Sequence, residues 1–359
     1  QLISLGPIPS IEPGEKINFV VALVCAKQLD DPNATNTSDT EVAREELMEH
    51  LNWAKRTYVG EDLNENGELD EGEDLDDDGK LDRYILPEPP RDPKVKFLPG
   101  EDYVDIYWQK NSLESIDPIS KKKDFEGFKL YRSNLGDDQD LDLIRASELI
   151  AQWDSTGNSI GFNNGFEEIE LEEVKVIDGE DYHFHFRISG LLRGWQYMFI
   201  LTAFDEGDEE LGLDPLESSF STNNYRVFMG SQTAVADDDW TVGVYPNPYR
   251  TSAAWDGEGS KNKKIYFYNL PENCTITIRT SAGELVDEFE HSSTTYGGED
   301  ISWFGDLAGT ADGRVFSGGE HAWDILSASN QGLAQGMYLF SVTDHASGKS
   351  YQGTFAVLR

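Results

Sequence analysis

Residues 62–82 hold the densest set of metal-binding side chains in the chain, and their spacing is regular. Within residues 62–73, oxygen-bearing side chains stand at positions 1, 3, 5 and 9, a glycine stands at position 6 and a glutamate at position 12. Calcium takes six to eight oxygen ligands, and a glycine at position 6 allows the sharp turn that brings them to one point. The predicted ligands are Asp62, Asn64, Asn66, Asp70 and Glu73, together with the backbone carbonyl oxygen of Glu68 at position 7.

The same pattern begins again at the next residue. The second set consists of Asp74, Asp76, Asp78, Lys80 and Asp82, with Gly79 at position 6. Ile85 stands where the closing glutamate would be, so this second site is expected to be weaker or completed in a different way. Because Glu73 ends the first loop and the adjacent Asp74 begins the second, the two calcium sites would lie next to each other.

The first loop matches the EF-hand calcium loop position by position. No exit helix is evident after either loop, so the segment resembles the calcium loops of dockerins and thrombospondin type 3 repeats more than a paired EF-hand sensor. That resemblance implies a structural ion. A solvated acidic linker is the alternative, since charge runs usually face water. The glycines and the apolar Leu69 and Leu81 recur in phase, which favours calcium binding.

The composition indicates several folded and strongly acidic domains. The chain has 359 residues, for which about two to four domains are expected. Its net charge is −39, whereas hydrophobic residues make up 38% and aromatic residues 11%. The acidic residues are therefore expected to lie on the surfaces of folded domains and do not indicate a disordered chain. Nucleic acid and anionic membranes are poor partners for such a charge, and divalent cations are suitable ones.

The two cysteines do not define the compartment. Cys25 lies in an apolar run and is expected to be a buried free thiol, and Cys274 lies in a strand-like run far away in sequence. A disulfide between them is the alternative, although nothing in their spacing supports it. No apolar run is long enough to span a membrane and no signal peptide is present at Gln1. The abrupt start favours a piece of a longer protein.

Residues 1–60 predict one strand and one helix. The strand is expected at residues 17–25, and Ser38 with Glu41 fits a capping box for the helix. Apolar residues then follow at near-helical spacing as far as Tyr58. One strand and one helix cannot form a core alone. We expect this segment to complete a sheet formed by upstream residues or to pack on the next domain.

Residues 87–233 begin with a proline-rich linker and continue with alternating, strand-like patterns. The segment resembles a fibronectin type III domain, on the strength of Trp108 in the second strand, Tyr131 in the third, and Leu191 six residues before Tyr197. The last pair is similar to the tyrosine corner of that family. The resemblance implies a β-sandwich core that contains these four residues. Insertions at residues 136–142 and 146–181 depart from the family pattern.

Residues 234–359 contain a second set of strand-like runs. Their motifs are Tyr-Pro-Asn-Pro at residues 245–248, a hairpin over residues 274–286 and Gly-Met-Tyr-Leu-Phe at residues 336–340. Together with the basic residue at the end of the chain, they resemble the small Ig-like C-terminal domains of secreted bacterial proteins, including type IX sorting domains. The resemblance implies export and surface attachment. A Gly/Asp-rich insertion at residues 295–319 departs from it.

No catalytic motif occurs in the chain, so no enzyme activity is expected. His183 and His185 share one face of a strand, where ordinary strand histidines are favoured over a zinc pair because no third ligand is near. Four tryptophans could line a sugar-binding face or belong to a sandwich core, and we favour the core. They are Trp240, Trp255, Trp303 and Trp323.

The predicted fold is mainly β, with tandem β-sandwiches (fibronectin type III-like and Ig-like), a short α/β N-terminal segment and calcium-binding loops. The expected divisions are residues 1–60, 61–86, 87–233 and 234–359. The predicted function is a non-catalytic extracellular or cell-surface structural region of a larger secreted bacterial protein, rigidified by calcium and contacting other protein domains or copies of itself. The alternatives are accessory modules of a secreted hydrolase and a carbohydrate-binding or adhesive module.

Overall fold

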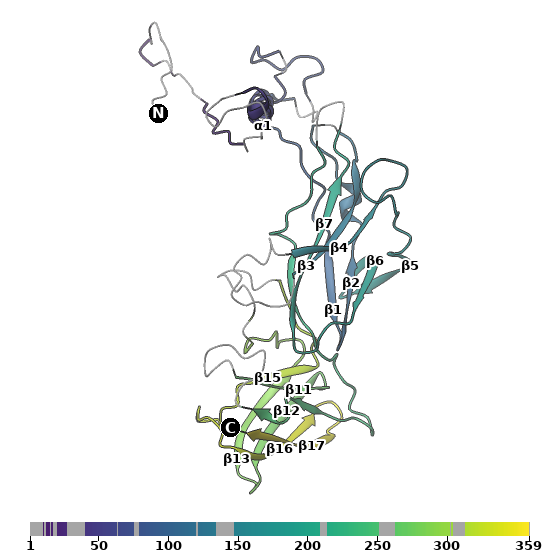
Figure 1. Cartoon of the computed structure of the whole chain (residues 1–359), viewed down its shortest axis with the longest axis vertical. Coiled ribbons are helices and arrows are strands. Elements are labelled where there is room, and N and C mark those ends of the chain that lie inside the picture. The colour runs from purple at the N-terminus through teal and green to yellow at the C-terminus, as the bar shows by residue number, and fades with distance from the viewer. Residues whose placement is uncertain are drawn as a thin grey trace. The chain divides into compact units, whose positions relative to one another are not determined.

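The computed structural model describes most of the chain in two compact units, residues 1–87 and residues 88–359. The described residues are 10, 12–14, 16, 20–26, 40–62, 64–74, 79–119, 121–133, 147–208, 214–250, 263–301, 303 and 313–358. The fold is mainly β, with tandem β-sandwiches and one short N-terminal α-helix (Figure 1). The predicted fold class is confirmed.

The predicted N-terminal helix is present. A short 3-10 helix, Val42–Arg44, leads into α1, Glu45–Val59. The Thr40 hydroxyl accepts a hydrogen bond from the Ala43 backbone N–H at 3.2 Å, which is the bond of an N-terminal cap. Ser38, the residue expected in that role, lies outside the described residues.

The strand expected at residues 17–25 is not found in its described part. Residues 20–26 have no strand partner, and Leu23 is 94% exposed. Cys25 is an exposed free thiol, so the expectation of a buried one was wrong. The apolar run has no neighbouring strand here, and the His50 ring instead lies 2.8 Å from the carbonyl oxygen of Cys25.

The first sandwich consists of a four-stranded and a five-stranded sheet. The first sheet has the order β1-β2-β6-β5 and contains Val95–Pro99 (β1), Tyr103–Trp108 (β2), Glu180–Ser189 (β6) and Glu170–Ile177 (β5). The second has the order β14-β8-β7-β3-β4 and contains Arg314–Val315 (β14), Asn224–Phe228 (β8), Gln196–Asp205 (β7), Phe125–Ser133 (β3) and Ser147–Asp154 (β4). A 3-10 helix, Asn111–Glu114, connects β2 to β3.

The core of this sandwich confirms most of the fibronectin-like prediction. Trp108, Leu191 and Tyr197 are buried in one cluster, and the Tyr197 hydroxyl accepts the Leu192 N–H at 3.0 Å, as a tyrosine corner does. Tyr131 was wrongly placed in this core. Phe128 and Leu130 face the core, so the alternation of β3 turns Tyr131 to the other face, where it packs against Phe220 outside the cluster.

The second sandwich also has two sheets. The larger has the order β10-β17-β16-β12-β13 and contains Tyr249–Arg250 (β10), Ser350–Leu358 (β17), Gly336–Asp344 (β16), Asn273–Thr280 (β12) and Leu285–Ser292 (β13). The smaller has the order β15-β11-β9 and contains Glu320–Trp323 (β15), Ile265–Tyr268 (β11) and Gly243–Tyr245 (β9). In the Tyr-Pro-Asn-Pro motif, the Asn247 amide bonds the Thr354 carbonyl and the Ala356 N–H, which ties the motif to β17.

The two sandwiches share hydrogen bonds and a small core. In the insertion at residues 295–319, β14 pairs in parallel with β8 of the first sandwich. Phe228 packs in a cluster with Tyr266, Ile301 and Trp303. Residues 88–359 therefore form one compact unit, consistent with apolar burial between the two sandwiches.

Candidate functional site

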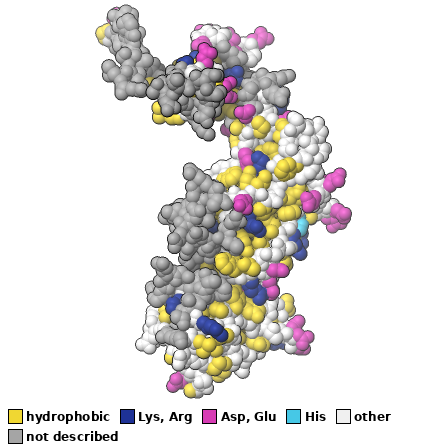
Figure 2. Space-filling view, viewed as in Figure 1, with side chains coloured by type: hydrophobic (Ala, Val, Ile, Leu, Met, Phe, Trp, Pro, Cys, Tyr) yellow, Lys and Arg dark blue, Asp and Glu magenta, His cyan; other side chains and the backbone are white. Residues whose placement is uncertain are grey.

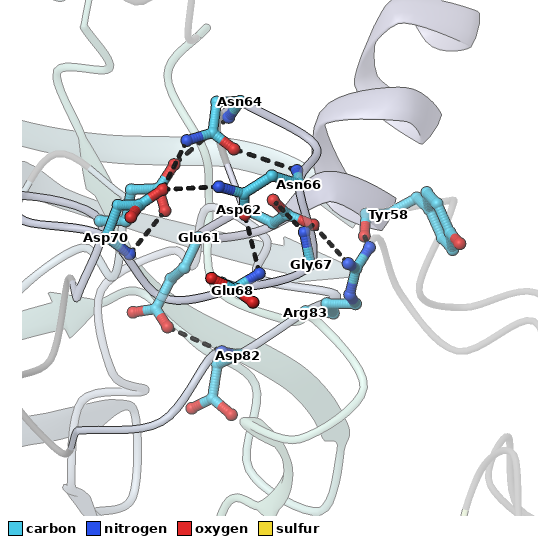
Figure 3. Close-up of polar contacts among 11 residues, drawn as sticks. Tyr58, Glu61, Asp62, Asn64, Asn66, Gly67, Glu68, Asp70, Asp82 and Arg83 are labelled. Carbon is cyan, nitrogen blue, oxygen red and sulfur yellow. Dashed lines mark hydrogen bonds and ion pairs between the residues drawn. The ribbon is translucent and has the colours of Figure 1, made fainter.

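The first acidic loop closes on its own first residue. The Asp62 carboxylate accepts the Gly67 backbone N–H at 3.1 Å to both oxygens, and Gly67 has a φ of +81° (Figure 3). A left-handed φ favours glycine, which explains the residue at position 6. This bond joins position 1 to position 6 and bends the loop around its side chains.

The last residue of the loop returns to the same place. Glu73 accepts the Asn64 N–H at 3.2 Å on one oxygen and the Asp70 N–H at 2.9 Å on the other. Asp62 is 2% exposed and Glu73 5% exposed, whereas the side chains between them are mostly exposed. The first and last predicted ligands are therefore both buried, and each accepts hydrogen bonds from the loop backbone.

The middle ligands are connected through Asp70. The side-chain amides of Asn64 and Asn66 each donate to one Asp70 oxygen at 2.7 Å. These two hydrogen bonds lower the pKa of Asp70, because they stabilise its ionised form. The loop holds this carboxyl as an anion, the form that binds a cation.

The second loop repeats the first where it is described. The Gly79 N–H donates to Asp74 at 2.9 Å, again from position 6 to position 1. Asp76 and Asp78 lie outside the described residues, so their predicted role is not tested. Glu68, Lys80 and Asp82 lie on the described backbone of the two loops.

A clasp closes the two loops, and we define it as residues 57–62 with residues 82–84. The Glu61 N–H donates to the Asp82 carbonyl at 2.9 Å, and the Asp82 N–H donates to the Glu61 carboxylate at 2.7 Å. The Tyr84 N–H donates to the Thr57 carbonyl at 2.7 Å. A Cβ at Gly60 would lie 2.4 Å from the Asp82 carbonyl oxygen, so only glycine fits this approach.

Arg83 supplies a positive charge at the base of the first loop. Its guanidinium lies 2.5 Å from the Asp62 carboxylate and sits over the Tyr58 ring at 5.2 Å (Figure 3). Buried carboxylates need a compensating charge or hydrogen bonds. The guanidinium of Arg83 thus already compensates the charge of the first predicted calcium ligand.

The donor set fits calcium in its chemistry. Its members are carboxylate, amide and carbonyl oxygens, which are the ligands that a hard cation takes. Among the residues that the structure describes, no group of three or more His, Cys, Asp or Glu side chains forms a metal-holding cluster. The predicted ligands of the first loop also include Asn64, Asn66 and the Glu68 carbonyl, and those of the second loop include Asp76 and Asp78, which lie outside the described residues. The calcium site stays a prediction.

Sequence reasoning missed Glu61 and Arg83, which flank the motif. Glu61 is 1% exposed, although its neighbours in the chain include many exposed acidic residues. The glycine before it was a usable signal, since Gly60 ends α1 and permits the close return of residue 82. Pairing between residues 61 and 82 is not local, so loop spacing alone cannot show it.

A second group of buried charged residues lies where the sandwiches meet, and we call it the junction. Glu320 is fully buried, accepts the Tyr245 hydroxyl at 2.5 Å and the Ser231 N–H at 2.9 Å, and lies 3.7 Å from the Arg193 guanidinium. Arg193 also sits over the Tyr268 ring at 4.6 Å. Burial raises the pKa of Glu320 to about 7, although the hydrogen bonds from Tyr245 and Ser231 and the charge of Arg193 act to lower it. The junction satisfies its carboxyl with protein groups.

The two strand histidines are half-buried, and His185 belongs to a group of charged side chains around Asp105. His185 bonds Asp105 at 2.7 Å, and Arg187 bonds the same carboxylate through two nitrogens at 2.7 Å. Burial opposes ionisation of Asp105, but Arg187 and His185 together lower its pKa. His183 and His185 are part of no metal cluster in the described ranges.

The tryptophans of the second sandwich are core residues where they are described. Trp240, Trp303 and Trp323 are buried, and each indole N–H donates to a protein oxygen at 2.8 to 2.9 Å. Trp255 lies outside the described residues. A sugar-stacking face needs exposed rings, so the core interpretation is favoured for these three.

The chain's surface is acidic without one concentrated patch on the face drawn in Figure 2, where Asp and Glu side chains are scattered over the described elements. Within the described residues, no helix has both the length and the apolar character needed to cross a membrane.

No family model and no curated protein matches the sequence. Solved structures with similar regions include PorZ, a surface component of the type-IX secretion system of Porphyromonas gingivalis, at 25% identity over 33% of this chain and 11% of PorZ, with a TM-score of 0.21. Dimeric latent PorU of the same organism is 14% identical over 76% of this chain and 20% of PorU, with a TM-score of 0.21. A two-domain fibronectin type III segment of chicken tenascin is 8% identical over 75% of this chain and 99% of the segment, with a TM-score of 0.22.

The chain thus spans a small fraction of PorZ and PorU. At these TM-scores the whole chains do not superimpose as one arrangement, so the assignment to tandem sandwiches rests on the strand pairing described above.

Proposed function

We propose that this chain is a non-catalytic structural region of a secreted bacterial surface protein, and that calcium orders its N-terminal unit. The observation that carries the proposal is the closed first loop, in which Asp62 and Glu73 are both buried and both accept hydrogen bonds from the loop backbone. Calcium would add the charge compensation that so many carboxylates need in one place.

Each predicted ligand has a distinct role toward the ion. Asp62 and Glu73 would hold it from the two ends of the loop, with Glu73 binding through both oxygens. Asn64, Asn66 and Asp70 would bind from the loop, and Glu68 would bind through its backbone carbonyl. The ion supplies positive charge and fixed directions, and it takes part in no reaction.

An extracellular location is supported by the calcium range of such loops. Loops of extracellular modules bind at about 0.1 to 1 mM, which calcium-rich surroundings provide. The strong negative charge of the chain is compatible with such surroundings and opposes binding to nucleic acid. The motifs at residues 245–248 and 336–340 support surface attachment, because they resemble those of bacterial sorting domains.

The junction supports a structural role for the larger unit. The β14–β8 strand pair and a buried cluster join the two sandwiches. Sandwiches joined in this way would hold neighbouring domains at a fixed spacing. Other protein domains or copies of this chain are the partners that such a spacer would serve. The described residues carry no arrangement of nucleophile and base that we would assign to catalysis.

Calorimetry with calcium tests the proposal. We expect binding at or below about 1 mM calcium, loss of the stronger site in Glu73→Gln, and a smaller effect in Asp82→Asn. Glu71→Gln is the control, since Glu71 is exposed and outside the ligand pattern. No binding by the unaltered chain at millimolar calcium would overturn the proposal.

A further inference from the structure

The chain contains four Asp-Pro pairs, which begin at Asp31, Asp92, Asp117 and Asp214. We propose that the bond between Asp92 and Pro93 is a site of self-cleavage, at which the Asp92 carboxyl group attacks the carbonyl carbon of its own residue. The reaction cuts one bond of the chain once, shortly before β1, and it acts on no other substrate. The proposal goes beyond the calcium function and is independent of it.

An aspartate is well suited to cut the peptide bond that follows it. One of its carboxyl oxygens can reach its own carbonyl carbon by closing a small ring, and such an intramolecular attack needs no encounter between two molecules. A proline after the aspartate favours the reaction, because its nitrogen belongs to a tertiary amide and leaves as a basic secondary amine.

The Asp92 carboxyl group has one oxygen held and one oxygen available. Oδ2 accepts a hydrogen bond from the Thr222 hydroxyl at 2.7 Å. Oδ1 is buried and has no hydrogen-bond partner within the residues that the structure describes. Buried polar atoms are nearly always hydrogen-bonded, so an exception needs an explanation. A nucleophilic oxygen needs an uncommitted lone pair, and Oδ1 meets that need.

The carbonyl group of Asp92 is held by a hydrogen-bond donor. The Asn111 side-chain amide donates to the Asp92 carbonyl oxygen at 2.8 Å, and Asn111 Oδ1 accepts the Lys94 N–H at 3.1 Å, which orients the amide. Beyond the bond, Pro93 is buried and its carbonyl oxygen accepts the Asn223 side-chain amide at 3.1 Å. Negative charge grows on the Asp92 carbonyl oxygen during the attack, so the Asn111 donor stabilises the transition state.

The Asp117–Pro118 bond provides a comparison within the chain. The Asp117 carbonyl oxygen also accepts a hydrogen bond, from the Lys121 N–H at 3.0 Å. Its two carboxyl oxygens, however, accept the Ile119 N–H and the Glu88 N–H, each at 2.9 Å. Attack by Asp117 would first have to break one of these hydrogen bonds. The structure therefore favours cleavage at Asp92.

The reaction has two steps. In the first, Asp92 Oδ1 forms a bond to the carbonyl carbon, the bond from that carbon to the Pro93 nitrogen breaks, and the nitrogen takes the proton of the carboxyl group. In the second, water adds to the cyclic anhydride thus formed and leaves Asp92 with a side-chain carboxyl group and a new terminal one. The net change is the hydrolysis of one peptide bond, with water as the co-reactant.

Mild acid should speed the first step, because that step uses the protonated carboxyl group. The hydroxyl and the amide that bond Asp92 carry no charge. Burial raises the pKa of the nearby Tyr225, and the charge of Asp92 is one of the smaller causes, so Tyr225 stays neutral. The adjacent Arg91 and Lys94 are exposed and stay positive. The acid dependence of the rate therefore belongs to Asp92.

Mass spectrometry of the folded full chain tests the proposal. At about pH 5, where an ordinary aspartate is still protonated in a small fraction of molecules, fragments that end at Asp92 and begin at Pro93 are expected. Their formation should be first-order and independent of protein concentration. Cleavage at the Asp117–Pro118 bond should be about 10-fold slower or more, because a hydrogen bond to the carboxylate must break first.

Three variants separate the roles. Asp92→Ala removes the attacking oxygen and should slow cleavage at this bond about 100-fold or more. Asn111→Asp keeps the acceptor for the Lys94 N–H and loses the donor to the carbonyl oxygen, so it should slow cleavage about 10-fold or more. Asp214→Ala is the control, since Asp214 is exposed and precedes another proline, and it should leave the rate at Asp92 unchanged.

Two measurements on the unaltered chain cover the case in which a variant fails to fold. In urea the contacts of Asp92 are lost, so cleavage there should slow to the rate of the other Asp-Pro bonds. In oxygen-18 water the anhydride opens at either carbonyl, so the label should enter the Asp92 side chain as well as the new terminal carboxyl group. Cleavage at Asp92 that is no faster in the folded chain than in urea, or label confined to the terminal carboxyl group, would overturn the proposal and leave the calcium function untouched.

Discussion

The two acidic loops of residues 62–82 and the junction around Glu320 both contain buried carboxylates, but the charge of these carboxylates is compensated in different ways. At the junction, Glu320 is surrounded by a tyrosine hydroxyl, a backbone N–H and a guanidinium, and its pKa is raised to about 7. In the loops, Asp62 lies beside the Arg83 guanidinium and accepts a backbone N–H, Glu73 accepts two backbone N–H groups, and hydrogen bonds from Asn64 and Asn66 lower the pKa of the neighbouring Asp70.

The contrast separates two kinds of buried acid. A carboxyl whose pKa is raised by burial, as at Glu320, is partly protonated near pH 7 and is held by protein groups. A carboxylate such as Asp70, whose pKa is lowered by hydrogen bonds from amides, remains in the ionised form that can bind a cation. Burial alone does not distinguish the two; the pKa direction and the neighbouring atoms do.

The largest effect is expected from removing the junction carboxyl. Glu320→Ala leaves the groups around it without their acceptor and should lower the free energy of unfolding of residues 88–359 by about 3 kcal/mol. Urea unfolding followed by tryptophan fluorescence measures it. Glu320→Gln is the control, because it keeps an acceptor oxygen without a charge, and it should cost clearly less. Equal losses in the two variants would show that Glu320 is held as an anion.

The pH dependence of the same junction has a defined sign. Glu320 has an ordinary pKa of 4.5 and a folded pKa of about 7, so the folded state holds more protons between these values. Stability from Glu320 is therefore fully present below about pH 4.5 and is lost as the pH rises to about 7, by about 1 to 3 kcal/mol.

Comparison with Glu320→Gln isolates that slope. Buried His291 and His321, whose pKa values burial lowers to about 4 and about 3, act in the opposite direction below pH 6.5 and cancel in the difference. The unfolding free energy of the unaltered chain minus that of Glu320→Gln should fall across this window. A flat difference would contradict a neutral Glu320.

A smaller effect on the unfolding free energy is expected at the tyrosine corner, where Tyr197 bonds the residue before Arg193. The Tyr197 hydroxyl accepts the Leu192 N–H and so fixes the loop that carries Arg193 toward Glu320. Tyr197→Phe should cost about 1 kcal/mol in the same unfolding measurement. If the loop also positions Arg193, the cost in a Glu320→Ala background should be smaller than in the unaltered chain. Additive costs would show that corner and junction are independent.

Much of the fold could be predicted from local patterns. Strand alternation located β2, β6 and β7, and the spacing between Leu191 and Tyr197 predicted the corner, because these signals depend on neighbours in sequence. The failures have different causes. Residues 20–26 are apolar like a strand but pair with no strand in the described part of the chain, whereas Tyr131 follows the core residue Leu130 and so faces the other side of β3.

The candidate site also contains features that local spacing predicts and features that depend on residues far apart in sequence. Twelve-residue spacing predicted the turn glycines Gly67 and Gly79, since each N–H bonds back to the first residue of its loop, whereas the calcium ligands stay a prediction. Glu61 and Arg83 were missed because they reach the loops through the clasp between residues 57–62 and 82–84. The junction was missed because its members come from both sandwiches, and no spacing connects Arg193 to Glu320.

Hydrogen exchange with and without calcium tests the central claim most directly. At free calcium about 100-fold above the dissociation constant, binding should stabilise the folded loops by about 2.7 kcal/mol, so amides of residues 60–84 should exchange up to about 100-fold more slowly. Amides of β7, which is buried throughout, should not change and serve as the control within the same chain. Equal exchange of residues 60–84 in calcium and in chelator would contradict the account.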